Sequence, residues 1–278
     1  MTDHIHGKSI IVTGAGGGFG RLICEKAAAR GAKVVGGDVD AGGLETTASA
    51  IRAAGGVFVG RRADVTDIEA MKALAGAAIE AHGHVDVIVN NAGDMPLAFF
   101  ADHQAAHAAW TRCLDINIKG VLNGIVAVHD HMIARRRGQV VNISSIYGNF
   151  PVAGAGVYGA TKAAVTFLSE ALRVESQGKI KVTTIRPTGV PATGLGSGVV
   201  NPQAIVGILG QNAASYLPAM QAAAAGAAPP AQLDAEEIAY IALAPEHIAD
   251  AVLHAIDQPW GVSVSDITVR ASGDGYIL

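Results

Sequence analysis

Short runs of β-branched and other apolar residues alternate along this chain with longer alanine-rich stretches. The runs have the length and composition of strands, and the stretches between them are long enough for helices. This alternation predicts a parallel sheet whose strands are joined by right-handed helical crossovers. We expect strands near residues 9–13, 33–37, 57–61, 86–90, 139–144, 180–185 and 264–269.

The size and composition of the chain favour one α/β domain. A chain of 278 residues can bury one large core, and half of its residues are hydrophobic while only 16% are charged. We therefore expect a single domain over residues 1–278. Between Thr188 and Ala244 the alternation gives way to Gly, Pro, Ala and Asn, which predicts a substrate lid at about 188–244.

Charge and cysteine usage argue against several classes of protein. The formal net charge is −4, and the basic cluster Arg135 to Arg137 is isolated, so we expect no nucleic-acid partner. Cys24 and Cys113 lie far apart in sequence, which favours reduced thiols and a cytoplasmic location. The first eight residues are polar and no apolar run approaches the roughly 20 residues that span a bilayer, so we expect no membrane partner.

A glycine-rich segment, Thr13 to Gly20, directly follows the first expected strand and reads Thr-Gly-Ala-Gly-Gly-Gly-Phe-Gly. Glycines let the backbone approach a pyrophosphate, and the helix expected from about Phe19 to Arg30 directs its N-terminal amides there. Taken alone, such a loop is more often a plain turn. We interpret it as a dinucleotide phosphate site with Gly14, Gly18, Phe19 and Gly20 against the cofactor.

Asp38 follows the second expected strand. A carboxylate there can accept hydrogen bonds from both hydroxyls of the adenosine ribose and repels a 2′-phosphate, which favours NAD over NADP. Val39, rather than an arginine, follows the acid. The alternative is a turn aspartate at the end of the strand, with Asp40 capping the next helix.

Tyr158 and Lys162 are four residues apart at the start of an expected helix, so their side chains share one face. An ammonium beside a phenol stabilises the phenolate, which can then act as a general base near working pH. Such a pair is more often a surface pair than a catalytic one. Its position matters because Ser145 ends a strand at the carboxyl edge of the sheet, where ligands bind, and can hold a substrate oxygen.

These motifs together resemble the short-chain dehydrogenase/reductase family over about residues 7–190. The resemblance rests on Thr13 to Gly20, Asn90-Asn91-Ala92-Gly93, Asn117, Ser145, and Tyr158 with Lys162. It implies a single Rossmann-type, doubly wound parallel sheet of about seven strands with helices on both faces. It also implies that Tyr158 is the acid/base and that Lys162 lowers the pKa of Tyr158 and holds the nicotinamide ribose. Ser145 would orient the substrate oxygen, and Asn117 would support a water relay to Lys162.

The resemblance extends to further cofactor contacts. It implies that Asp64 and Val65 contact the adenine and that Asn91, Ala92 and Gly93 form the turn beside the ribose. On the nicotinamide side it implies Pro187, Gly189 and Val190, although the motif departs from the family pattern, because Thr188 stands where a glycine is usual and Thr193 lies one residue later than the usual threonine.

Substrate contacts are expected near these motifs and in the lid. The candidates are Met95, Phe99, Phe100, Tyr147, Phe150, Leu195 and Tyr216, each of which could equally be ordinary core. Few charges lie nearby, so we expect a neutral, apolar substrate. His103 and His107 have metal-ligand spacing on a helix, but no third ligand is evident and we expect no metal.

The expected function is an NAD-dependent oxidoreductase that interconverts a secondary alcohol and its ketone, on an apolar cyclic or aromatic substrate. The alternatives are a ketoreductase for a steroid-like substrate and a dinucleotide-binding sensor without catalysis. Two apolar helices, at about 103–136 and 156–177, are candidate subunit interfaces, so we expect a homotetramer or a homodimer. The sequence leaves open whether residues 272–278 reach a neighbouring subunit.

Overall fold

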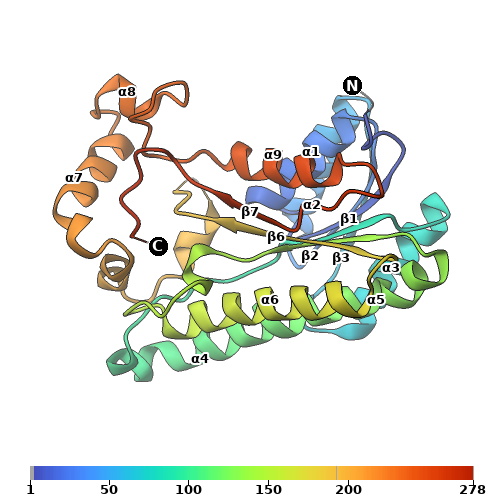
Figure 1. Ribbon diagram of the computed structural model, residues 1–278, viewed down its shortest axis with the longest axis horizontal. Helices are drawn as coiled ribbons and strands as arrows, with labels where there is room; N and C mark the ends of the chain where they lie inside the picture. The colour runs from blue at the N-terminus through green and yellow to red at the C-terminus, as the bar shows by residue number, and fades with distance from the viewer. Residues whose placement is uncertain (1–2, 192, 278) are drawn as a thin grey trace.

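Seven parallel strands form one sheet in the order β3-β2-β1-β4-β5-β6-β7 (Figure 1). The computed structural model describes residues 3–191 and 193–277. The strands are β1 Ser9–Thr13, β2 Lys33–Asp38, β3 Val57–Arg62, β4 Val87–Asn90, β5 Gln139–Ile143, β6 Lys181–Pro187 and β7 Asp266–Val269. The predicted doubly wound parallel sheet of about seven strands is confirmed.

The order of the strands reverses between β1 and β4, which pair in register from Ile10 opposite Val87 to Val12 opposite Val89. All residues of β1, β4 and β5 are buried, which is why these strands are continuous apolar runs rather than alternating ones. Loops on either side of such a switch point diverge, so a crevice forms at the carboxyl edge of the sheet.

Helices cover both faces of the sheet (Figure 1). On one face lie α1 Gly18–Ala29, α2 Ala41–Ala53 and α9 Pro245–Ile256; on the other lie α3 Ile68–His82, α5 Gly120–Arg135 and α6 Gly156–Glu175, with α4 His103–Leu114 beside α6. Each face buries its own apolar cluster, one containing Ile23, Val34 and Val252 and the other Leu74, Ile88 and Val165.

The helix predicted over about 103–136 is not one regular α-helix. A π-helical turn, Asp115–Lys119, separates α4 from α5. The turn inserts one extra residue into the helical register and places Asn117 in a buried position. A pattern of apolar residues does not reveal such a turn, because the apolar stripe continues on both sides of it.

The segment 188–244 has no strand among its described residues, as predicted, but it contains helices that the composition did not reveal. These are the 3₁₀-helices η4 Gly194–Gly198, η5 Pro202–Ile208 and η6 Gly210–Asn212, followed by α7 Ala213–Ala224 and α8 Pro230–Leu233. Ala192, in the middle of this segment, lies outside the described residues, as does Leu278 at the chain end. Within the described parts of the chain, no helix has the length and apolar character needed to cross a membrane.

Candidate active site

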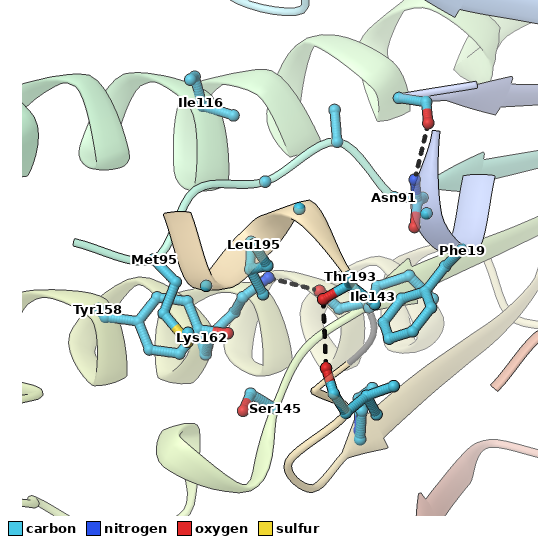
Figure 2. Close-up of a pocket in the computed structure, with 18 of the residues that line it drawn as sticks. Phe19, Asn91, Met95, Ile116, Ile143, Ser145, Tyr158, Lys162, Thr193 and Leu195 are labelled. Atoms are coloured by element: carbon cyan, nitrogen blue, oxygen red, sulfur yellow. Dashed lines mark hydrogen bonds between the residues drawn. The ribbon is translucent and has the colours of Figure 1, made fainter. Parts of the chain in front are cut away.

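A cavity of about 770 Å³ lies at the carboxyl edge of the sheet. Most of the predicted site residues line it: Gly14, Gly18, Phe19, Asp38, Asp64, Val65, Asn91, Ala92, Gly93, Ser145, Tyr158, Lys162, Pro187, Gly189 and Val190. Figure 2 shows Phe19 and Asn91 toward one end of the view and Tyr158, Lys162 and Met95 toward the other. Two predicted residues, Gly20 and Asn117, lie behind the wall.

The glycine loop has a conformation that requires its glycines. Gly14 and Gly18 have φ values of +67° and +49°, which L side chains rarely adopt. At Gly20, a Cβ would collide with the carbonyl oxygen of Gly14, so this residue allows α1 to pack against the loop rather than facing the cavity. Gly17 caps α1 without a side-chain hydrogen bond, which leaves the first amides of the helix available to an anion. The loop therefore fits a pyrophosphate.

Asp38 ends β2 at the rim of the cavity. One carboxylate oxygen accepts a hydrogen bond from the amide of Gly16 at 2.8 Å and the other from the amide of Asp40 at 2.9 Å. Asp40 caps α2 through the amide of Gly42. Asp38 thus has the structural role considered above as an alternative, and it also holds a carboxylate beside the glycine loop, where it fits an adenosine ribose.

Asp64 and Val65 follow β3 and form the next part of the wall. The Asp64 carboxylate accepts hydrogen bonds from the amide and the hydroxyl of Thr66, at 2.9 and 2.8 Å. Val65 is buried, and its carbonyl accepts a hydrogen bond from the Asn123 amide at 2.8 Å. These contacts fix the wall that the resemblance assigns to the adenine.

Ser145, Tyr158 and Lys162 converge on one side of the cavity (Figure 2). Ser145 caps a short 3₁₀-helix after β5, and α6 begins at Gly156, so Tyr158 and Lys162 lie in its first turns. The Lys162 ammonium donates a hydrogen bond to the carbonyl of Ile143 at 2.9 Å and lies 5.7 Å from the centroid of the Tyr158 ring. Both side chains are almost fully buried.

Burial dominates the protonation of this pair. It raises the pKa of Tyr158, and the hydrogen bond with Ser145 acts in the opposite direction. Burial also lowers the pKa of Lys162 to about 8, because the charged ammonium loses water. In the chain by itself the phenol is therefore neutral at working pH.

Asn117 holds the turn after β4 from behind the cavity wall. Its amide nitrogen donates to the carbonyl of Asp94 at 2.9 Å and to the hydroxyl of Thr161 at 3.0 Å, and its oxygen accepts from the amide of Asp94 at 2.9 Å. The Asp94 carboxylate is in turn paired with Arg112 at 2.7 Å. Asp94 and Thr161 were not predicted, since neither belongs to a motif. Together these bonds connect the π-helical turn to the loop beside Lys162.

The substrate candidates divide into two groups. Met95, Tyr147 and Leu195 line the cavity, whereas Phe99, Phe100, Phe150 and Tyr216 do not. Phe100 is 73% exposed and packs edge-on against Trp110, and the Tyr216 hydroxyl donates to the carbonyl of Ile241. Residues that the sequence did not single out complete this part of the wall: Leu97, Val199, Pro202, Ile205, Met220 and Tyr276.

Few charges face the cavity. Among the described lining residues, Asp38, Asp64 and Lys162 are the charged ones, and none belongs to the wall of Met95, Tyr147 and Leu195.

The Thr188 hydroxyl is buried at the wall without a hydrogen-bond partner in the described part of the chain. Thr193 donates to the carbonyl of Val190 at 3.3 Å. No group of three potential metal ligands, with or without the predicted pair His103 and His107, occurs among the described residues.

The geometry defines a dinucleotide cleft joined to a tyrosine and lysine pair, and comparison with known proteins agrees. The family model of the short chain dehydrogenases matches residues 8–203. The uncharacterized oxidoreductase Lmo0432 of Listeria monocytogenes is 34% identical over 268 residues, which is 95% of this chain and 96% of that protein. The chain belongs to the short-chain dehydrogenase/reductase family, and it is an oxidoreductase of that family.

Two solved structures are similar over most of their length. A short chain dehydrogenase/reductase from Burkholderia phymatum in complex with NAD has a TM-score of 0.74 and 30% identity, covering 96% of this chain and 90% of that one. A metagenomic short-chain oxidoreductase in complex with NADP has a TM-score of 0.72 and 27% identity, covering 96% and 98%.

Proposed function

We propose that this protein is an NAD-dependent dehydrogenase that interconverts a neutral, apolar secondary alcohol and its ketone. One observation carries the proposal: Ser145, Tyr158 and Lys162 face the same cavity as the glycine loop and Asp38. A site that only bound a dinucleotide would not need a buried phenol and ammonium beside it. The uncharged wall of Met95, Tyr147 and Leu195 favours a substrate without charge.

The roles of the side chains follow from their chemistry. Ser145 and Tyr158 hold the substrate oxygen by hydrogen bonds, and Tyr158 takes the hydroxyl proton during oxidation or returns it during reduction. Lys162 carries a positive charge below pH 8 and favours the phenolate form of Tyr158. A nicotinamide, when bound, accepts the hydride from the carbinol carbon or supplies it. Asn117 keeps the loop of Asp94 in position.

The preference for NAD rests on Asp38. Relatives of similar fold hold NAD in one case and NADP in another, so family membership alone does not decide between them. A carboxylate at the end of β2 accepts ribose hydroxyls and repels a 2′-phosphate. Val39, which follows it, carries no charge, and the neighbouring Arg62 donates a hydrogen bond to the Val39 carbonyl at 3.2 Å.

The direct test is the formation of NADH from NAD, with NADP alongside, across a panel of aliphatic, cyclic and aryl secondary alcohols. Turnover with NAD supports the proposal and begins to order substrates by size. Turnover confined to NADP contradicts the argument from Asp38. Tight binding of NADH without turnover of any alcohol or ketone in the panel contradicts the proposed dehydrogenase.

A further inference from the structure

The last residues of the chain return to the cavity. After β7, the C-terminal tail, defined as residues 270–277, runs beside the segment that carries α7 (Figure 1). Backbone hydrogen bonds hold it there. The amide of Gly273 donates to the carbonyl of Tyr240 at 2.8 Å, and the amide of Ile277 donates to the carbonyl of Ile208 at 3.1 Å. The side chain of Asn212 binds the carbonyl of Gly275 at 3.0 Å.

This tail places Tyr276 in the wall of the cavity. The ring of Tyr276 packs edge-on against the ring of Tyr216, with centroids 5.5 Å apart and an angle of 69° between the planes. Its hydroxyl abuts Gly189, where any Cβ would collide with it. Tyr216 is buried and is fixed by its own bond to Ile241. The ring of Tyr276 is therefore supported from behind while its other side borders the cavity.

Tyr276 lines the same cavity as the reacting groups. It packs in the same apolar cluster as Tyr147, whose ring meets that of Tyr158 edge-on at 5.5 Å between centroids. Burial raises the pKa of both Tyr147 and Tyr276, so these phenols stay neutral. Residue 276 lies outside the part of the chain that the family model matches, 8–203.

Building on the proposed function, we propose that Tyr276 is a specificity-determining residue that limits the size of the substrate. Its ring contacts the apolar body of the alcohol or ketone and closes this part of the cavity. The substrate class that fits such a wall is a neutral secondary alcohol that carries a ring, because aromatic side chains contribute broad apolar contact without charge. Removing the ring opens space for bulkier substrates.

The test compares Tyr276→Ala, Tyr276→Phe and the matched control Ile277→Ala. Ile277 is the next residue of the tail, and its side chain lies near Gly210 rather than in the cavity wall. The readout is the ratio of kcat/KM for a bicyclic alcohol to kcat/KM for propan-2-ol, with saturating NAD. We expect Tyr276→Ala to raise this ratio about tenfold or more, since apolar pockets discriminate by roughly 10- to 200-fold per missing group. The ratio should change less than about threefold in the other two variants.

Two results would overturn this inference. An unchanged ratio in Tyr276→Ala means that the ring does not contact substrate. An equal loss for both alcohols, together with weaker NADH binding, means that Tyr276 only supports the loop of Gly189. If the wild type binds NADH but turns over no alcohol, the proposed function fails. The size limit can still be tested by binding: the rise in Tm of the NADH complex is then measured with a bulky and with a small ketone for each variant.

Discussion

At the scale of single residues, the site is controlled by what burial does to charge. Lys162 is almost fully buried, and within the described part of the chain its ammonium makes one hydrogen bond, to the carbonyl of Ile143, so it is only partly compensated for lost water. Its pKa is about 8, against 10.5 for an exposed lysine. The buried ammonium of Lys162 therefore lowers the stability of the folded protein by an amount that depends on pH.

We predict that Lys162→Met changes how stability depends on pH. Between pH 8 and 10, the unfolded chain keeps the lysine proton while the folded chain releases it, so the wild type gains stability as the pH rises. Relative to the variant, its free energy of unfolding should rise by on the order of 2 kcal/mol over this range. Urea unfolding at pH 8, 9 and 10 measures the free energy of unfolding of both proteins. The contributions of other lysines, such as Lys8, are the same in both and cancel in the difference. Parallel curves for the two proteins would contradict the argument.

We predict that removing the charge of Asp38 weakens the preference for NAD over NADP. In Asp38→Asn the amide oxygen still accepts the bond from Gly16, but the bond from the amide of Asp40 and the negative charge are lost. The ratio of kcat/KM with NADP to kcat/KM with NAD should rise about tenfold or more, because bonds to a charged acceptor contribute roughly 1.5–3 kcal/mol. Adding Val39→Arg should raise the ratio further. A ratio equal to that of the wild type would show that Asp38 does not select the cofactor.

At the scale of elements, the π-helical turn joins three parts of the site. It buries Asn117, whose amide binds the loop of Asp94 and the hydroxyl of Thr161 on α6. Thr161 also donates to the carbonyl of Tyr158 at 2.7 Å, so one hydroxyl touches both Asn117 and the helix that carries Tyr158 and Lys162. This contact makes Thr161 a positioning residue.

We predict that Thr161→Val lowers kcat about tenfold and the free energy of unfolding by about 1–3 kcal/mol, because a buried hydrogen-bond partner is removed while the volume is kept. Affinity for NADH should change little, since Thr161 does not line the cavity. Thr161→Ser, which keeps the hydroxyl, is the matched control and should stay close to the wild type. Steady-state kinetics, NADH titration and urea unfolding measure these effects. Equal behaviour of the two variants would contradict the positioning role.

The sequence predicted elements well where burial determines the pattern. The strands agree with the predicted ranges to within two residues because buried parallel strands read as continuous apolar runs. The π-helical turn was missed because helical periodicity does not mark it. Helix α7 was missed because Pro218 lies inside it, and proline in a helical pattern reads as a break. Tyr276 was missed because no local pattern links residue 276 to Tyr147; only the path of the tail brings them together.

At the scale of the whole molecule, apolar side chains remain exposed on helices α5 and α6. These include Leu122 and Val126 on α5 and Phe167 and Val174 on α6, with Phe167 78% exposed. The helices are the two that the sequence predicted as subunit interfaces. We propose that they form the contact of a homo-oligomer, because a second subunit would bury these exposed apolar side chains.

We predict a mass of two or four times 28.2 kDa by light scattering at working concentration. Phe167→Glu should lower that mass, because it places a charge in the proposed contact. Ile238→Glu makes the same change at an equally exposed residue outside these helices and should leave the mass unchanged. A wild-type protein of monomeric mass would refute the proposal.

We propose that Tyr158 moves the substrate proton in an oxidoreductase whose cofactor cleft and tyrosine–lysine pair share one cavity. The most direct measurement is the turnover of Tyr158→Phe with NAD and the best alcohol of the panel, in a variant first shown to fold and to bind NADH like the wild type. We predict a fall in kcat of about 10²- to 10⁴-fold, the range that general acid–base catalysis contributes. Near-normal turnover by that variant would contradict it.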